Sequence, residues 1–180
     1  MSKIPHYVPE PEDKTGFTEQ FDRFYTTFAG LYDGIIRLLP FWKRWLKATL
    51  PYIQGPRVLE ISFGTGYLLM QYAANYEVFG IDYNQRFVDR LREKLAGSGL
   101  TADIRQANVE ALPYEDGYFD SIVNTMAFTA YPDGQKAIAE MHRVLKPGGR
   151  IVMVDVDYPC DGNRLGTWIT RGWIAGGDIV

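Results

Sequence analysis

The sequence has a single cysteine, Cys160, and only two histidines, His6 and His142, among its 180 residues. One cysteine excludes a disulfide bond within the chain, and the composition therefore fits a reducing compartment; we expect a cytoplasmic protein. The histidines are far apart in the sequence and no cluster of cysteine and histidine accompanies them, which argues against a zinc site. We predict no bound metal.

Long hydrophobic runs are also absent. The longest candidate, residues 28–42 (FAGLYDGIIRLLPFW), is interrupted by Asp33, Arg37 and Pro40, whereas a membrane-spanning helix needs about 20 consecutive apolar residues. The N-terminus carries no apolar core after its basic residue. We therefore expect neither a signal peptide nor a transmembrane segment.

The chain lacks an excess of positive charge. Its 19 lysine and arginine residues against 22 acidic residues give a formal net charge of −3. Because nucleic-acid binding depends on a basic surface, we expect no nucleic-acid partner. Lys43, Arg44 and Lys47 form a small basic cluster, which we interpret as the solvated face of a helix; peripheral contact with a membrane surface is the alternative.

The N-terminal third is polar at first and helical afterwards. Residues 1–16 contain several prolines and are predicted to form a flexible arm. Aromatic and aliphatic side chains recur at three- and four-residue steps in residues 17–36, and residues 41–53 continue as an amphipathic helix. We therefore predict a helical region over residues 17–54, which either packs on the core or forms a lid over a binding site.

Short apolar runs alternate with helical patterns in the following part of the chain. We predict strands at residues 57–62, 77–82, 102–108, 119–124 and 150–156, and helices at residues 67–75, 85–97 and 134–145. Asn84 is predicted to cap the second of these helices and Gly97 to end it. The alternation predicts an α/β fold, a Rossmann-like doubly wound parallel sheet of about five strands, with residues 55–160 as its core.

A glycine-containing bend follows the first predicted strand, at residues 62–66. Ligands of open parallel sheets bind at the carboxyl ends of the strands, and Gly64 and Gly66 would let a ligand approach the backbone. A tight turn that binds nothing would also favour two glycines. The dinucleotide pattern G-x-G-x-x-G fails in both registers, because Leu69 or Ser62 and Tyr67 stand where glycine is required. An NAD-dependent oxidoreductase is therefore disfavoured.

Polar side chains mark the ends of the first three predicted strands. Glu60 would repel a diphosphate but attract an ammonium or sulfonium group. Asp82 can accept both hydroxyl groups of a ribose, and the amide oxygen of Asn108 can accept from an adenine amino group. A ribose, an adenine and a cationic amino-acid end together describe S-adenosylmethionine.

Four segments carry a resemblance to a known family: VLEISFGTG, VFGIDYN, ANVEALPYEDGYFD and EMHRVLKPGGRIVMVD. They run in the family's order from about residue 57 to residue 156, and the chain resembles the class I S-adenosylmethionine-dependent methyltransferases. Within them it is most similar to the group that includes the ubiquinone and menaquinone biosynthesis C-methyltransferases. The family's first motif is acid-x-Gly-x-Gly-x-Gly. Glu60, Gly64 and Gly66 match it, and Ser62 replaces its first glycine.

The resemblance implies S-adenosylmethionine as cofactor, S-adenosylhomocysteine as product and a set of cofactor-binding residues. Those expected at the methionine and methyl side are Tyr32 from the lid helix, Glu60, Ser62, Gly64, Gly66, Asn124, Thr125 and Met126. Those expected at the adenosine side are Asp82 on the ribose, Tyr83 along the adenine, and Asn108 with Val109 at the adenine amino group. At position 108 the family often has aspartate, so the acceptor is kept but its charge is lost.

Two departures from the family pattern concern Ser62 and the C-terminus. The Ser62 hydroxyl either contacts the cofactor or displaces the loop and weakens binding; we expect binding to be retained. Family members continue beyond the fifth strand with a helix and two more strands, the last antiparallel. Only 24 residues follow Val156 here, so we expect a shortened chain that lacks this hairpin and ends in an irregular tail over residues 161–180.

Without that hairpin, the fifth strand would have an open edge. Trp168, Ile169, Trp173 and Ile174 would bury this edge or help to form a dimer, so the chain is expected to be a monomer or a homodimer.

The expected activity is methyl transfer to a small hydrophobic or aromatic molecule. Such a transfer mainly requires that donor and acceptor are aligned and that water is excluded, and we assign no catalytic residue. The alternative is a methyltransferase-like module that binds the cofactor or a partner without catalysis. The methyl acceptor and the atom that is methylated stay open at this point.

Overall fold

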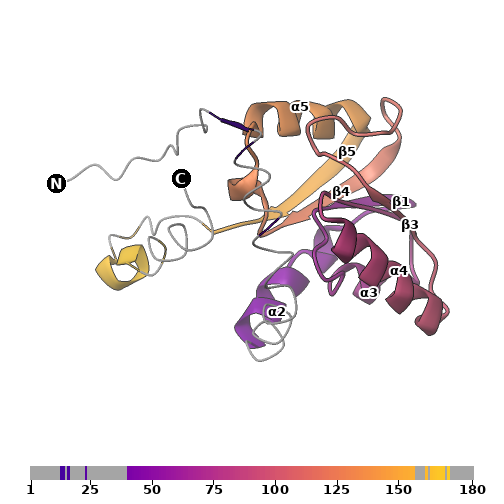
Figure 1. Ribbon diagram of the computed structural model, residues 1–180, viewed down its shortest axis with the longest axis horizontal. Helices are drawn as coiled ribbons and strands as arrows, with labels where there is room; N and C mark the ends of the chain where they lie inside the picture. Colours follow the sequence, from indigo (N-terminus) through magenta and orange to yellow (C-terminus); the bar gives the residue numbers. More distant parts are fainter. Residues whose placement is uncertain are drawn as a thin grey trace.

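A computed structural model of the chain describes residues 13, 14, 16, 23, 40–156, 161, 163–168 and 170. Its centre is a sheet of five parallel strands in the order β3-β2-β1-β4-β5 (Figure 1). The strands are β1 (Arg57–Ile61), β2 (Glu77–Asp82), β3 (Asp103–Gln106), β4 (Phe119–Thr125) and β5 (Leu145–Val154). The predicted Rossmann-like parallel sheet of about five strands is confirmed.

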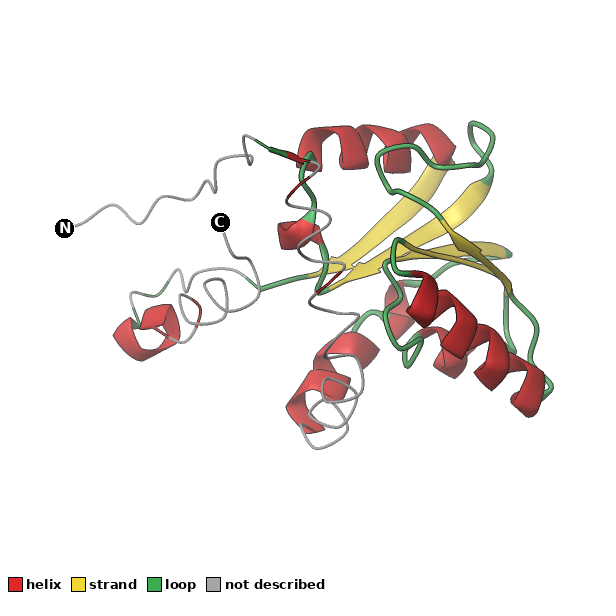
Figure 2. Ribbon diagram, viewed as in Figure 1, coloured by secondary structure: helices red, strands yellow, loops and turns green. Residues whose placement is uncertain are grey.

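Helices lie on both faces of this sheet (Figure 2). The described helices are α2 (Pro40–Lys47), α3 (Leu69–Tyr72), α4 (Gln85–Ser98) and α5 (Gly134–Val144), with short 3-10 turns η1 (Leu50–Tyr52) and η2 (Phe128–Ala130). Helices α3 and α4 cover one face and α5 covers the other. None of the helices in the described residues is long and apolar enough to cross a membrane.

Strand β1 shows why the sheet is buried on both faces. Val58 packs in the cluster that includes α3 and α4, whereas Leu59 and Ile61 pack in the cluster that includes α5. All three are fully buried, and burying an aliphatic side chain of this size contributes about 1.5–3 kcal/mol. The short, nearly continuous apolar run of β1 is typical of a strand covered on two sides.

Helix α4 begins where the sequence predicts and ends one residue later, at Ser98. The Asn84 side-chain oxygen accepts hydrogen bonds from the N–H groups of Arg86 (2.9 Å) and Phe87 (3.4 Å), so its role as N-cap is confirmed. The prediction that Gly97 ends the helix is wrong. Gly97 lies within α4, and Gly99 adopts the left-handed conformation (φ 73°) that terminates it.

Two predicted helices are shorter than expected. The helix predicted over residues 67–75 is reduced to the four residues of α3, and the helix predicted over residues 41–53 is divided into α2 and η1. Pro51 explains the second difference, because it has no N–H and disfavours α-helical conformation at the preceding residue. A four-residue helix supplies little dipole, so α3 gives weak support for anion binding after the bend.

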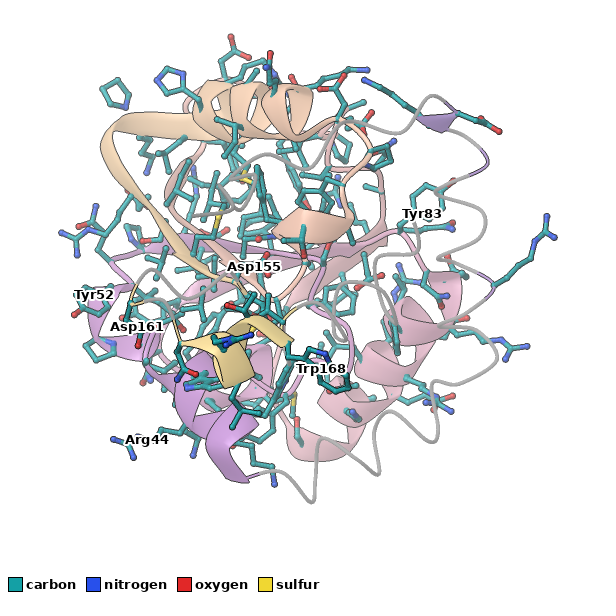
Figure 3. The ribbon with its side chains drawn as sticks, turned by 90° about the vertical axis from the view of Figure 1, so that its left-hand side faces the viewer. Arg44, Tyr52, Tyr83, Asp155, Asp161 and Trp168 are labelled. Atoms are coloured by element: carbon teal, nitrogen blue, oxygen red, sulfur yellow. The ribbon has the colours of Figure 1, made fainter. Side chains whose placement is uncertain are left out.

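The carboxyl ends of the strands meet at one edge of the sheet. Ile61 of β1 pairs with Ile81 of β2 on one side and with Asn124 of β4 on the other. Because the strand order reverses between β1 and β4, this edge is the topological switch point at which open α/β sheets bind ligands. Figure 3 looks onto this edge, with Asp155 near the centre of the view.

The end of the described chain differs from the sequence prediction. Residues 164–168 are helical, and Trp168, which was expected to be buried over the edge of β5, is 77% exposed. The other three residues proposed to cover that edge lie outside the described residues.

Candidate functional site

A cleft opens at the carboxyl ends of the strands, next to the bend that follows β1. Nine of the twelve residues predicted to bind a cofactor line it: Glu60, Ser62, Gly64, Asp82, Tyr83, Asn108, Val109, Thr125 and Met126. Gly66 and Asn124 lie outside this lining, and Tyr32 lies outside the described residues. The strand ends therefore bring together side chains that are up to 66 positions apart in the sequence.

Sequence reasoning missed several residues of the cleft. Trp42 and Leu46 reach it from α2, and their spacing of four residues on the predicted amphipathic helix was a usable signal. Tyr131 lines the cleft from the loop after β4, and no local pattern marks it. The remaining lining residues are Phe63, Thr65, Tyr67, Leu68, Ile81, Asn84, Phe87, Ala107, Ala127, Ala130 and Pro132.

Glu60 lies in the floor of the cleft and is almost completely buried, with 1% of its surface exposed. The hydroxyl group of Tyr72, from α3, donates a hydrogen bond to Glu60 Oε2 at 2.6 Å. Burial raises the pKa of Glu60 to about 8; the hydrogen bond from Tyr72 opposes this rise, and the negative charge of Asp82 adds to it. Glu60 was expected to carry a negative charge. With a pKa of about 8, it is instead mainly protonated at neutral pH.

Asp82 joins the end of β2 to the bend after β1. Its Oδ2 accepts a hydrogen bond from the Gly64 N–H at 2.8 Å, and its Oδ1 accepts one from the Asn84 N–H at 2.9 Å. The side chain is 7% exposed and lines the cleft. Asp82 therefore shapes the bend in addition to the ribose contact predicted for it.

The two glycines of the bend have different surroundings. Gly64 has φ 53°, and a Cβ added there would meet nothing within 4 Å, which leaves open space beside the backbone in the cleft. Gly66 has φ 71°, and a Cβ added there would collide with the side chain of Leu91 on α4. Gly64 is thus suited to close approach of a ligand, whereas Gly66 serves the packing of α4 against the bend.

Ser62 occupies the position of the missing glycine in a left-handed conformation, with φ 55°. Its hydroxyl oxygen lies 2.9 Å from the hydroxyl oxygen of Tyr131, and either group can be the donor. Asn124 Nδ2 donates to the same Tyr131 oxygen at 2.6 Å and also points at the Ile61 carbonyl oxygen at 3.4 Å. The hydroxyl of Ser62 is therefore part of a hydrogen-bonded chain that connects the ends of β1 and β4.

Ser62 and Tyr131, two members of this hydrogen-bonded group, are half-buried where they line the cleft. Burial raises the pKa of Tyr131 well above its usual value, so the phenol stays protonated at physiological pH. Asn124 is fully buried, and its Oδ1 has no hydrogen-bond partner in the described part of the chain. Asn124 therefore acts behind the cleft wall, by holding Tyr131, and does not line the cleft as was expected.

The opposite end of the cleft follows β2 and β3. Tyr83 is 45% exposed there, on the right of the view in Figure 3. Asn108 Oδ1 accepts a hydrogen bond from the Glu110 N–H at 2.9 Å. The oxygen predicted to receive an adenine amino group thus already has one donor, and a carbonyl oxygen can accept a second. Val109, which also lines the cleft, is buried.

The loop after β4 forms the wall next to Thr125 and Met126. Met126 has φ 56°, the second non-glycine residue of the described chain with a left-handed backbone. Asp155, after β5, fixes this loop by accepting from the Phe128 N–H at 2.7 Å. Unusual backbone conformations in non-glycine residues cost energy and cluster at functional sites.

The composition of the cleft agrees with a nucleoside that carries a cationic end. Two carboxyl groups, Glu60 and Asp82, line walls that are otherwise mainly apolar, and open space lies beside Gly64. A diphosphate would meet the Asp82 carboxylate, whereas an ammonium or sulfonium group would be attracted to it. No group of three histidine, cysteine or acidic side chains suited to a metal ion occurs in the described residues.

The basic cluster of α2 lies beside the cleft. The Lys43 and Lys47 ammonium groups lie 5.6 and 5.9 Å from the ring centre of Tyr67, a cleft residue. Such distances allow cation–π attraction. Arg44 is exposed. Both interpretations of this cluster, as a solvated helix face or as a membrane contact, stay predictions.

A family model described as a methyltransferase domain matches residues 59–153 of the chain. The ubiquinone/menaquinone biosynthesis C-methyltransferase UbiE of Geotalea uraniireducens is 32% identical over 152 residues. That match covers 78% of this chain but 65% of the relative. The chain thus spans slightly less than two thirds of the length of this curated relative.

Solved structures share the fold. The YcgJ protein of Bacillus subtilis is 28% identical with a TM-score of 0.63, and the match covers 66% of this chain and 53% of that protein. The cyclase SpnF is 26% identical with a TM-score of 0.60, and the match covers 66% of this chain and 46% of that protein. One fold of this type is therefore found in proteins with different names and activities.

Proposed function

The chain belongs to the class I S-adenosylmethionine-dependent methyltransferases, and on this premise we propose that it transfers a methyl group from S-adenosylmethionine to a small hydrophobic or aromatic molecule. The observation that carries the proposal is that one cleft is lined by Glu60, Asp82 and Asn108, at the ends of β1, β2 and β3. These residues would serve as the acid, the ribose acceptor and the adenine acceptor for the cofactor.

The proposed division of the cleft follows from its polar groups. The bend of residues 62–66 and Glu60 would hold the methionine end, Asp82 the ribose, and Tyr83 with Asn108 the adenine. When bound, S-adenosylmethionine supplies an activated methyl group, and its transfer to an acceptor leaves S-adenosylhomocysteine, in which the sulfur is uncharged and the ammonium group is kept. The chain's own contribution is to orient the reactants and to exclude water; we assign no catalytic base.

The acceptor class is inferred from the apolar part of the cleft. Trp42 and Leu46 on α2 and Phe63 after β1 lie on its walls, and a pocket with apolar walls and few polar groups suits a flat, poorly soluble molecule. The name of the Geotalea relative indicates C-methylation in quinone biosynthesis. We therefore propose an aromatic ring of the quinone-precursor type as the acceptor and a ring carbon as the methylated atom.

Calorimetric titration of the whole chain tests the cofactor first. We expect S-adenosylmethionine and S-adenosylhomocysteine to bind and NAD not to bind, because the dinucleotide glycine pattern is missing. Formation of S-adenosylhomocysteine in the presence of a hydroxylated aromatic ring then tests methyl transfer. A folded chain that binds neither nucleoside would refute the proposal, and measurable binding of NAD would favour an oxidoreductase.

A second candidate is a module that binds the cofactor without transferring a methyl group. Two observations favour it: Ser62 stands in place of a motif glycine with φ 55°, and the structurally similar SpnF is a cyclase. The two candidates differ in turnover, because the module would bind S-adenosylmethionine and form no S-adenosylhomocysteine with any acceptor. The cytoplasmic location, the absence of nucleic-acid partners and a monomeric or homodimeric state stay predictions.

A further inference from the structure

Glu60 is a buried acid with very little compensation. Its described hydrogen-bond partner is the Tyr72 hydroxyl group, and none of the ion pairs between described residues includes it. The strand residues beside it in register are Gly80 on β2 and Val123 on β4, which bring no charge. An ionised carboxylate in such surroundings is costly unless a cation or several donors accompany it.

We propose that Glu60 releases its proton when a cationic ligand enters the cleft, and that Tyr72 is the positioning residue that holds the resulting carboxylate. The inference rests on the proposed function, because it takes the cationic amino-acid end of the nucleoside as the ligand group. The O–H bond of the Glu60 carboxyl group breaks, its electron pair stays on the carboxylate, and the proton passes to the buffer. The Tyr72 O–H bond stays intact.

The titratable groups around Glu60 agree with this sequence of events. Burial, opposed by the hydrogen bond from Tyr72 and reinforced by the negative charge of Asp82 at the end of β2, raises the pKa of Glu60 to about 8. A cation in the cleft acts in the opposite direction on both acids. Burial and the Glu60 charge also hold the pKa of Tyr72 well above its usual value, so Tyr72 donates to Glu60 in either protonation state.

Proton release would make the cleft selective for charge. A ligand with an ammonium or sulfonium group causes Glu60 to ionise and then pairs with the carboxylate. A nucleoside without a cationic group leaves Glu60 protonated, so its affinity does not benefit from this ion pair. Affinity for the cationic ligand should therefore rise with pH up to about pH 8.

Calorimetric titration at pH 7, repeated in buffers of different ionisation enthalpy, measures the protons released on binding. With S-adenosylhomocysteine we expect wild type to release about one proton more than Glu60→Gln. With 5′-methylthioadenosine, which has neither cationic group, we expect no difference between the two proteins. S-adenosylmethionine and S-adenosylhomocysteine both carry the ammonium group, but only S-adenosylmethionine carries the sulfonium group. The difference in proton release between these two ligands therefore gives the contribution of the sulfonium. The Glu60→Gln protein also corrects for protons exchanged by the ligand itself.

Variants of the neighbouring tyrosines test the role of Tyr72. Tyr72→Phe should still release the proton but bind S-adenosylhomocysteine roughly tenfold or more weakly, because a hydrogen bond to a charged group is lost. Tyr76→Phe is the matched control, since Tyr76 lies edge-on to Tyr72 at 6.1 Å and donates to the Ile53 carbonyl oxygen instead. In a Glu60→Gln background, Tyr72→Phe should change the affinity little.

The outcomes distinguish the inference from the function on which it rests. Equal proton release by wild type and Glu60→Gln would overturn the inference while leaving cofactor binding intact. Equal affinity losses in Tyr72→Phe and Tyr76→Phe would overturn the positioning role. If neither nucleoside binds to the folded wild-type chain, the proposed function itself fails. Circular dichroism of each variant verifies that it is folded.

Discussion

The hydroxyl groups of Ser62 and Tyr131 lie 2.9 Å apart and join the bend after β1 to the loop after β4. Ser62 thereby gains a contact that glycine cannot make, at a position where its backbone conformation favours glycine. The presence of serine in the first motif is explained by a partner 69 positions away in the sequence.

Removal of the Tyr131 hydroxyl should be destabilising. Tyr131→Phe leaves the Ser62 hydroxyl and the Asn124 amide without their shared partner, and we expect the free energy of unfolding to fall by about 1–3 kcal/mol. Urea denaturation measures this change. Part of this loss is the hydrogen bond between Tyr131 and Ser62. Ser62→Gly should therefore lower the free energy of unfolding less in the Tyr131→Phe background than in wild type. Strict additivity of the two changes would show that the two hydroxyl groups do not stabilise each other.

Ser62→Gly and Ser62→Ala separate the hydrogen bond from the backbone. Both changes remove the hydroxyl, but only glycine adopts φ 55° without steric cost. We expect Ser62→Ala to be less stable than Ser62→Gly by about 1 kcal/mol. Thermal or urea denaturation measures the difference in stability between the two variants. An alanine variant as stable as the glycine variant would show that the backbone at position 62 imposes no cost on a non-glycine residue.

The two glycines of the bend should respond differently to alanine. Gly66→Ala places a methyl group against Leu91 and should lower the free energy of unfolding by more than Gly64→Ala does. Both changes strain a left-handed backbone, but Gly64→Ala meets no protein atom within 4 Å, so beyond that shared cost its effect should be weaker binding of S-adenosylhomocysteine. Denaturation and calorimetry on the same pair of variants test both statements; the reverse ranking would show that ligand approach does not depend on Gly64.

Stability should depend on pH through Glu60. The folded chain holds the Glu60 proton up to about pH 8, whereas the unfolded chain releases it near the ordinary value of 4.5. Between these values the folded state binds more protons, so the contribution of Glu60 to stability decreases as pH rises, by up to about 1.4 kcal/mol per pH unit. Wild type minus Glu60→Gln, measured by urea denaturation from pH 5 to pH 8, should show this slope. A flat difference would contradict it.

The sequence was sufficient for the sheet and for much of the cleft, because both depend on local patterns. Apolar runs mark β1, β2, β4 and the second half of β5, and acids at strand ends must meet at one edge when the strands are parallel. Tyr131 could not be found in this way, since its approach to Ser62 depends on the fold of the η2 loop and its anchor at Asp155. The protonation of Glu60 depends on its complete burial beside Tyr72, which no sequence pattern encodes.

The two left-handed residues, Ser62 and Met126, also bear on protein engineering. Glycine or asparagine tolerates such backbone angles, so substitution of Met126 is the more direct route to a heat-resistant variant, whereas substitution of Ser62 also removes its contact with Tyr131. Both residues line the cleft, and a gain in thermal tolerance there would be made at the cost of the shape that the ligand meets.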